Sequence, residues 1–190
     1  MFRIISLKLI LGPNYGYTKV GDVSMYKDNL VWSTTDWSDE FKVEFDIIVT
    51  KELVSQVHNV FHITTGDNVC KGCRNPAVWA NRAKYFTICS NVNGNNNYCK
   101  NKDYLLNQPN HIEILQRHNS IGNAIYSIIV DGNTFHETIN TTPMKFQDVK
   151  LYLSDPWHES LAGYGKLSNF KVTNLDPKIK IFFLLFQNSP

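Results

Sequence analysis

Two carboxylates on one expected strand are the first residues whose spacing suggests chemistry. In EFKVEFDIIVT (40–50), Glu44 and Asp46 lie two positions apart, so an extended strand points both to the same face. Retaining glycoside hydrolysis needs two carboxyl groups about 5–5.5 Å apart, and some glycoside hydrolases place three along a strand as Glu-x-Asp-x-x-Glu. Val49 occupies the third position here. We therefore interpret the pair as a solvated strand face beside Lys42.

The histidines do not form a metal-binding motif. His58 and His62 are four residues apart, which is a ligand spacing on a helix but not along a strand, and no HExxH pattern includes them. The sequence also has no G-x-S-x-G nucleophile elbow. No catalytic residue is predicted, and the histidines are interpreted as scattered over the surface: His58, His62, His111, His118, His136 and His158.

Calcium is the one cofactor for which oxygen ligands exist at expected loop tips. Asp67-Asn68, the segment Asn93–Asn97 and Asp155 supply such oxygens. Asn-Gly segments are more often simple turns, because Asn readily adopts the left-handed conformation. We predict no metal and no cofactor, with bound calcium as the alternative.

Aromatic side chains beside polar ones suggest sugar recognition. A ring covers the C–H face of a sugar while amide, carboxylate and guanidinium groups bond its hydroxyls. Trp79 with Arg74, and Trp157 with Asp155, are the candidate pairs. The alternative is that Trp79 fills the core and Trp157 packs under the Asp155-Pro156 turn. The remaining candidates for exposed aromatic residues are Trp32 and Trp37.

An Asn-rich segment is the expected place for a ligand. Asn91–Asn97 holds five Asn and one Gly, and Asn side chains both donate and accept hydrogen bonds, as sugar hydroxyls do. Loops on a rigid scaffold commonly carry recognition. Asn93 and Asn95 are therefore predicted to bind a ligand, with Trp79 or Trp157 nearby. The alternative is that the Asn residues only satisfy turn geometry.

Four cysteines lie within 30 residues of each other. Cys89 and Cys99 flank the Asn-rich segment, so a bridge across the neck of a hairpin is geometrically reasonable, by analogy with secreted domains. Cys70 and Cys73 are the second candidate pair. A zinc site fits poorly, because Cys89 and Cys99 are too far apart in sequence for one ligand knuckle. Cross-pairing and four free thiols remain alternatives.

Strand signals dominate the elements that must position these residues. The segment 40–50 alternates strictly, with Phe41, Val43, Phe45, Ile47 and Val49 on one face. Similar runs recur between turn signals such as Asp131-Gly132 and Asn93-Gly94. About eleven to thirteen short strands in two antiparallel sheets are expected, as a β-sandwich. The other predicted strands are 59–65, 76–80, 84–90, 111–117, 124–130, 134–139, 148–154 and 167–173.

The composition indicates that residues 1–190 form a single globular domain. Hydrophobic residues make up 43% and aromatic residues 13%, which argues against disorder. A formal charge of +2 without basic clusters argues against nucleic acid. The segment 1–12 is predicted as a strand rather than a signal peptide, because Lys8 interrupts its apolar run. The apolar tail at 179–187 is too short to span a membrane.

Ordered blocks of the chain carry a resemblance to a known domain type: FHITTG, CRNPAVW, KYFTICSNVNGNNNYC, NHIEILQR, YSIIVDG and DVKLYLSDPW…GKLSNF. Together they resemble a concanavalin-A-like, laminin-G-like sandwich domain of the kind found in secreted and matrix proteins of invertebrates. The resemblance covers about 30–174 and leaves 175–190 as a tail or extra strand. The galectin patterns H-x-N-x-R and W-x-x-E-x-R are absent, so galectin specificity is not implied.

The resemblance implies an all-β jelly roll of two antiparallel sheets, an extracellular location, and binding of a glycan or an extracellular protein. We expect a glycan-binding module with its site at the loop rim. A protein-binding or matrix-adhesion module is the alternative, and a glycoside hydrolase is the third possibility. The candidate ligand-binding residues are Arg74, Trp79, Asn93, Asn95, Asp155 and Trp157.

Overall fold

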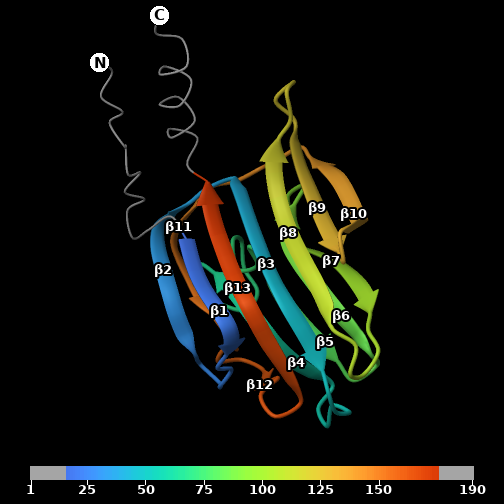
Figure 1. Ribbon diagram of the computed structural model, residues 1–190. Helices are drawn as coiled ribbons and strands as arrows, with labels where there is room; N and C mark the ends of the chain where they lie inside the picture. Colours follow the sequence, from blue (N-terminus) through green and yellow to red (C-terminus); the bar gives the residue numbers. More distant parts are fainter. Residues whose placement is uncertain (1–15, 176–190) are drawn as a thin grey trace, which may run out of the picture.

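A computed structural model of the chain describes residues 16–175. Within them, thirteen strands and no helix form two sheets that face each other (Figure 1). The six-stranded sheet lies in front in Figure 1 and has the order β1-β13-β3-β8-β9-β10. Its strands are β1 (Gly16–Val23), β13 (Gly165–Leu175), β3 (Glu40–Val49), β8 (Asn110–His118), β9 (Ala124–Val130) and β10 (Asn133–Asn140).

The seven-stranded sheet lies behind it and has the order β2-β11-β4-β5-β6-β7. The two-residue strand β12 (Glu159–Ser160) pairs in parallel with β4, and the other pairings in both sheets are antiparallel. The predicted two-sheet jelly-roll sandwich is confirmed. The remaining strands are β2 (Leu30–Trp37), β11 (Phe146–Tyr152), β4 (Val57–Thr64), β5 (Ala77–Asn81), β6 (Tyr85–Val92) and β7 (Asn95–Asp103).

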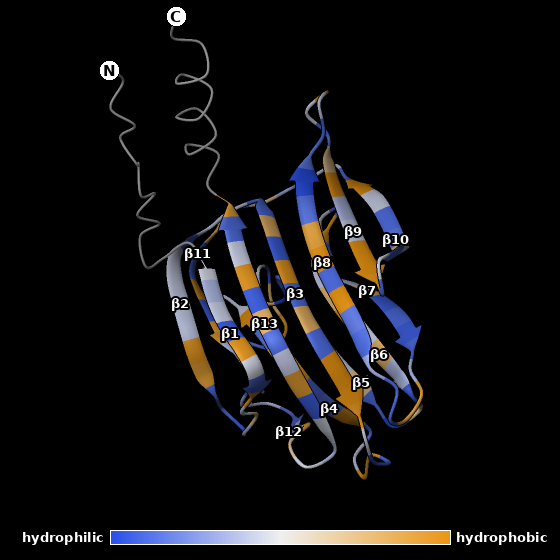
Figure 2. Cartoon of the chain, viewed as in Figure 1, coloured by the Kyte–Doolittle hydropathy of each residue, from blue (hydrophilic) through white to orange (hydrophobic). Residues whose placement is uncertain are grey.

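The core lies between the sheets and follows from alternation along the strands. All five apolar residues predicted on the inner face of β3 are buried, and Figure 2 shows the alternating colours along β3 and β13. At its centre, the ring of Phe45 lies 5.2 Å from that of Phe61 on β4 and 5.9 Å from that of Phe170 on β13. The edge-on contact with Phe61 joins the two sheets, whereas the tilted contact with Phe170 joins neighbouring strands of one sheet.

Both turns predicted from Asn-Gly and Asp-Gly are two-residue hairpins. Asp131 and Gly132 join β9 to β10 with φ of 51° and 77°, and Asn93 and Gly94 join β6 to β7 with φ of 54° and 71°. Positive φ at both central positions is the geometry that follows the twist of the flanking strands. Within Asn91–Asn97 only Asn93 and Gly94 lie outside the strands, because strand pairing continues to Val92 and resumes at Asn95.

Several expectations about exposure were wrong. Trp37 was a candidate for an exposed aromatic residue, but it is fully buried, with its ring 5.3 Å from that of Phe41. The alternation that predicts a solvated face with Glu44 and Asp46 also directs Glu40 to that face, yet Glu40 is buried and accepts a hydrogen bond from the backbone N–H of His118. Trp37 belongs to the main core between the sheets, and Glu40 lies at the start of β3 beside the end of β8.

Strands β1, β2 and β7 were not predicted, because their sequences are polar and alternate weakly. All three lie at the edges of the sheets, where one side of the strand has no neighbour. The predicted strand at 1–12 and the apolar tail at 179–187 fall outside the described residues. No described helix has the length and hydropathy needed to cross a membrane.

Candidate functional site

Three neighbouring strands of the seven-stranded sheet present His62, Trp79 and Cys89 on the same outer face. Their chain neighbours Ile63 and Val78 point inward and belong to the core, so strand alternation directs these three away from it. Trp79 packs there with Ala77 and Cys89 in a small apolar cluster separate from the main core. The ring is only 4% exposed. Trp79 therefore does not fill the main core, and it is not open to solvent either.

Two connections cover this outer face. The β4–β5 connection folds back onto the sheet, with Thr65 N–H donating to the carbonyl of Gly72 and Asn75 N–H to that of Ile63. The β11–β12 connection brings in Asp155, whose N–H donates to Asn59 Oδ1 on β4 at 2.8 Å. Side chains that alternation leaves on the outer face of β4 are therefore enclosed.

Asp155 is fully buried and organises the covering connection. Its carboxylate lies 2.8 Å from His62 Nδ1 and accepts hydrogen bonds from the backbone N–H groups of Trp157 and His158. It also lies 2.9 Å from His158 Nδ1. Burial raises the pKa of Asp155, but the hydrogen bonds and charges of His158 and His62 outweigh burial and hold that pKa well below its usual value. Both carboxylate oxygens are therefore engaged by groups of the protein itself.

His62 bridges Asp155 to the second connection. Its Nε2 lies 2.6 Å from the carbonyl oxygen of Cys73, opposite the contact of Nδ1 with the carboxylate. Both neighbours are acceptors, so the ring satisfies both only when each nitrogen carries a proton. We predicted that His58 and His62 lie on the surface; this was wrong, because His62 is buried under the two connections and His58 is buried against the ring of Tyr164.

A hollow of about 280 Å³ opens beside this network. Its apolar part is formed by Trp79, Val57 and the Cys89–Cys99 disulfide. Polar side chains make up the rest of its wall: Arg74, Asn81, Thr87, Asn97 and His158. Such a combination of an apolar wall and a few polar groups is common in small-molecule sites.

Arg74 comes from the covering connection and lies over Trp79. Its guanidinium carbon is 4.8 Å from the centre of the indole ring, in a cation–π contact. Nε donates to the carbonyl of Asn68 at 3.3 Å, and Nη1 donates to Oδ1 of Asn97 on β7. Burial lowers the pKa of Arg74, and the charge of Asp155 offsets this effect only in part. A guanidinium nevertheless remains cationic at neutral pH.

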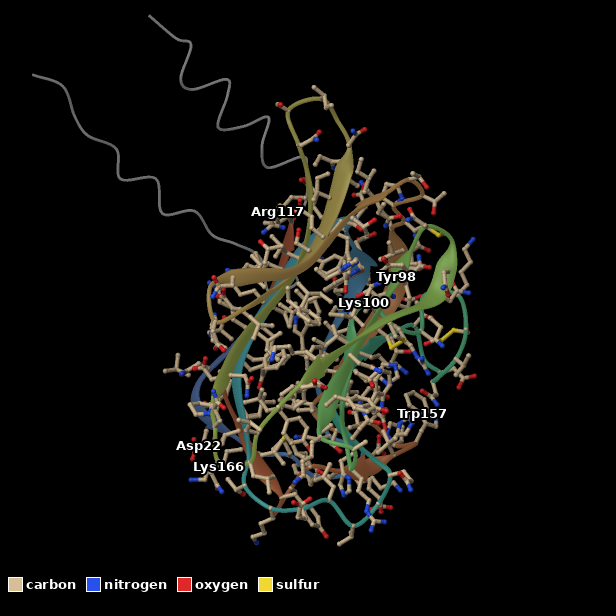
Figure 3. The ribbon with its side chains drawn as sticks, turned by 90° about the vertical axis from the view of Figure 1, so that its right-hand side faces the viewer. Asp22, Tyr98, Lys100, Arg117, Trp157 and Lys166 are labelled. Atoms are coloured by element: carbon tan, nitrogen blue, oxygen red, sulfur yellow. A yellow bond between two sulfur atoms is a disulfide. The ribbon has the colours of Figure 1, made fainter. Side chains whose placement is uncertain are left out.

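Both predicted disulfides are confirmed, and no free cysteine is found among the described residues. Cys89 and Cys99 face each other directly in the β6–β7 pairing, and their bridge forms one wall of the hollow. Cys70 and Cys73 are bridged within the β4–β5 connection that carries Arg74. The second bridge shortens the free length of this connection. Figure 3 shows the sulfur atoms on the same side of the molecule as Trp157.

The structure brings four of the six predicted ligand-binding residues together. Arg74, Trp79, Asp155 and Trp157 belong to one continuous set of contacts on this outer face. Within it, only Arg74 and Trp79 line the hollow. Asp155 is buried behind it, and Trp157, 36% exposed, packs its ring edge-on against His62 at 5.4 Å.

Asn93 and Asn95 lie at the tip of the β6–β7 hairpin and do not line the hollow. Asn93 Oδ1 accepts hydrogen bonds from the N–H and hydroxyl of Thr141, at 2.7 and 3.1 Å. Its backbone N–H donates to Asn140 Oδ1 at 2.9 Å. Asn95 Oδ1 accepts from the N–H of Asn97. The Asn93 side chain therefore connects the two sheets, and its role in the turn matches the alternative reading of this segment.

Sequence reasoning missed His158, Thr87 and Asn97 as lining residues. Thr87 and Asn97 were assigned to a strand and to the Asn-rich segment, and nothing in their local pattern separates them from their neighbours. Strand register could have identified Thr87. Residues directly opposite each other in paired strands lie on the same face of the sheet, and Thr87 is opposite Trp79. His158 reaches the hollow only through a contact between residues 79 positions apart, its Nδ1 lying 3.3 Å from Trp79 Nε1.

The carboxylates Glu44 and Asp46 lie on the outer face of the other sheet. Glu44 is held by Lys42 and, at 3.1 Å, by Lys171, and Asp46 by His111 and Asn169 at 2.6 Å each. Burial raises both pKa values, but these partners hold them below their usual values. A glycosidase acid needs a raised pKa. Neither carboxyl group is therefore suited to donate a proton.

No group of three or more His, Cys, Asp or Glu side chains in residues 16–175 is arranged to hold a metal ion. Among the oxygen ligands considered for calcium, Asp155 is committed to His62 and His158. Asn93 is committed to Thr141. The backbone carbonyl of Asp67 accepts the hydroxyl of Thr64 at 2.6 Å.

Similarity to known proteins is found in the fold and not in the sequence. No protein-family model matches the sequence, and no curated protein sequence matches it significantly. Solved structures do match. The receptor-binding domain of botulinum neurotoxin D is 11% identical with a TM-score of 0.52, over 90% of this chain and 47% of that chain. Trypanosoma rangeli sialidase is 12% identical with a TM-score of 0.50, over 78% and 23%.

A pentraxin from Limulus polyphemus is 10% identical, with a TM-score of 0.49, over 87% of this chain and 80% of that chain. The chain spans about half the length of the toxin domains that it matches. At these identities the common feature is the arrangement of strands. By its two sheets the chain is a jelly-roll β-sandwich, and the neurotoxin D domain has a similar fold.

Proposed function

We propose that this domain is an extracellular binding module that recognises a glycan in the hollow on the outer face of the seven-stranded sheet. The observation that carries the proposal is that Arg74 lies over the ring of Trp79 and donates to Asn97, in a hollow that His158 also lines. The fold alone does not select a ligand, so the argument rests on these side chains.

The two kinds of surface in the hollow suit a sugar ring. Trp79 and the Cys89–Cys99 bridge offer an apolar wall for C–H groups. Asn97, Thr87 and His158 place amide, hydroxyl and imidazole groups at its polar side, and these groups donate and accept hydrogen bonds as sugar hydroxyls do. A volume of about 280 Å³ lies near the lower end for ligand pockets, which suits one or two sugar units.

The paired cysteines support the proposed extracellular location. All four are paired, and disulfides persist in oxidising compartments such as the cell exterior. The covering connection that carries Arg74 depends on one bridge, and the wall of the hollow on the other. The proposed site therefore needs an oxidising environment to keep its shape.

A glycan array tests the proposal, with the wild-type protein compared with Asn97→Ala. Asn97 is exposed and lines the hollow, so its removal should weaken binding about tenfold, as expected for losing a hydrogen bond to a ligand. The matched control is Asn133→Ala, an exposed Asn at the β9–β10 turn, which should bind as the wild type does. Equal binding by Asn97→Ala and the wild type would place the site elsewhere.

A protein- or matrix-adhesion function is the second candidate, supported by a different surface. Strand β10 is an edge of the six-stranded sheet and exposes Phe135 and Ile139, at 40% and 48%. An edge strand with exposed apolar side chains can pair with a strand of another protein. A wild-type protein that binds no glycan, but whose adhesion to matrix-coated surfaces is lost in Phe135→Ser/Ile139→Ser, would favour this function.

A further inference from the structure

Arg74 is a partly buried cation whose hydrogen bonds and ring contact within residues 16–175 are all with neutral groups. Its guanidinium donates to the carbonyl of Asn68 and to the amide oxygen of Asn97, and its carbon lies over the Trp79 ring. Nη1 also lies 3.9 Å from Sγ of Cys89. No carboxylate of residues 16–175 lies within ion-pair distance of it, unlike the cations held by Glu44 on the other sheet.

The carboxylate whose charge acts on Arg74 makes its hydrogen bonds elsewhere. Asp155 acts on Arg74 through its charge, but its oxygens are directed at His62, His158 and the N–H of Trp157. The two imidazoles on Asp155 supply the donors that this carboxylate needs. Arg74 therefore brings a positive charge to the hollow that no described side chain neutralises directly, and such a charge is costly in a partly buried position.

We infer that the hollow selects an anionic sugar, and that a carboxylate or sulfate group of the glycan binds the Arg74 guanidinium. This inference rests on the proposed glycan-binding function and adds the chemical class of the ligand. The planar guanidinium presents several N–H donors in a fixed fork, which matches the oxygens of either group. His158, whose side chain is 23% exposed, adds an imidazole at the other side of the hollow.

Asn97 has a defined part in this selection. Its amide oxygen orients Arg74 from β7 without neutralising it. A carboxylate at the same position would form an internal ion pair with Arg74 and occupy the place of the ligand anion. Because Asn and Asp have nearly the same shape, Asn97→Asp changes the charge of the site and leaves its geometry almost intact.

The test measures the affinity of matched oligosaccharides by titration calorimetry at low salt. One probe is a hexasaccharide of alternating glucuronate and N-acetylglucosamine, compared with its carboxyl-reduced form. The other is a sulfated galactose hexasaccharide, compared with its desulfated form. The wild type should bind at least one acidic member about tenfold or more tightly than its neutral counterpart. The pair with the larger acidic-to-neutral affinity ratio identifies the anion as carboxylate or sulfate. This ratio should fall as salt is added, because screening weakens the contact between the anion and Arg74.

Three variants separate charge from other contributions. Asn97→Asp and Arg74→Gln should bring the acidic-to-neutral ratio close to one. Asn97→Ala should weaken both members of a pair and keep most of the ratio, since Arg74 retains its charge. Melting temperatures and the mass of the oxidised proteins confirm that each variant is folded with both bridges.

The outcomes are distinguishable. A wild-type ratio near one, with neutral binding that still depends on Asn97, would overturn the anionic class and leave the glycan function standing. An acidic preference that persists in both Asn97→Asp and Arg74→Gln would overturn the role of Arg74. Absence of binding to all four oligosaccharides and to the glycan array would overturn the proposed function, and this inference with it.

Discussion

The carboxylate of Asp155 and the imidazole of His62 form a fully buried pair, 2.8 Å apart, between residues separated by 93 positions. The pair holds the β11–β12 connection against β4. The other nitrogen of His62 contacts the carbonyl oxygen of Cys73 and so holds the β4–β5 connection in place. Arg74 follows Cys73 directly in the chain. The position of the hollow therefore depends on a contact that no ligand would touch.

Replacing Asp155 by Asn should destabilise the protein by about 3–5 kcal/mol at pH 7, because it leaves buried His62 without its charged partner. The folded pKa of Asp155 lies below the unfolded value of about 3.9. Its contribution is therefore complete above about pH 5 and is lost as pH falls below about 4. Urea unfolding of wild type and Asp155→Asn between pH 7 and 2 measures this.

The difference between the two proteins in the free energy of unfolding should stay constant down to about pH 5 and then shrink. Asp103→Asn, at an exposed position, is the control and should change stability by no more than about 0.5 kcal/mol. A difference that does not vary over the whole pH range would contradict the lowered pKa.

His58 should make the protein less stable in mild acid. Its side chain is buried against the ring of Tyr164, and its Nδ1 has no hydrogen-bond partner among the described residues. Burial lowers the pKa of His58, while the charge of Glu159 raises it in part. The unfolded state, with a pKa near 6.5, then binds the proton more readily, so stability falls as pH decreases below about 6.5.

His58→Phe keeps a ring in this position and removes the titrating group. Chemical unfolding at pH 7.5 and 5.5 should show a smaller loss of stability in the variant than in the wild type. An equal loss in both proteins would assign the pH dependence to other groups.

Asn93 should matter for stability rather than for ligand binding. Asn93→Ala removes two hydrogen bonds from Thr141 and places Ala at a φ of 54°, so we expect a loss of about 1–3 kcal/mol. Asn93→Gly keeps the positive φ and isolates the hydrogen bonds. Thermal unfolding measures both variants, and unchanged glycan affinity would separate the hairpin tip from the site. A large loss of affinity in a folded Asn93→Gly variant would return the site to this tip.

Phe45→Ala should cost about 3–5 kcal/mol, because Phe45 is fully buried at the centre of the sandwich. Val20→Ala, at an apolar position that is 79% exposed, is the control and should be nearly neutral. Equilibrium denaturation measures both. A loss below about 1 kcal/mol for Phe45→Ala would contradict the assigned packing between the sheets.

The Cys89–Cys99 bridge should stabilise the fold by about 2–3 kcal/mol, because it closes a short loop in the unfolded chain. The double variant Cys89→Ser/Cys99→Ser tests this in denaturant. Mass spectrometry after alkylation of the native protein should detect no free thiol at these two positions. Detection of both thiols in protein purified without reductant would exclude the bridge.

The alternation of apolar residues in β3 was sufficient to predict the inward face of that strand. The Asp131-Gly132 turn was equally predictable, because positive φ at successive positions favours a small set of residue types. The cysteine pairs were also within reach of the sequence, since each is separated by ten residues or fewer. These features depend on interactions between residues close along the chain.

Alternation also placed His62 correctly on the face opposite Ile63, but it does not reveal whether that face is covered. The β11–β12 connection covers it, and Asp155 reaches His62 across 93 residues. The polar strand β7 likewise forms because β6 offers it a partner. Local sequence therefore determined the direction of side chains. Only the tertiary structure decided which of them are enclosed, because enclosure depends on segments distant in the chain.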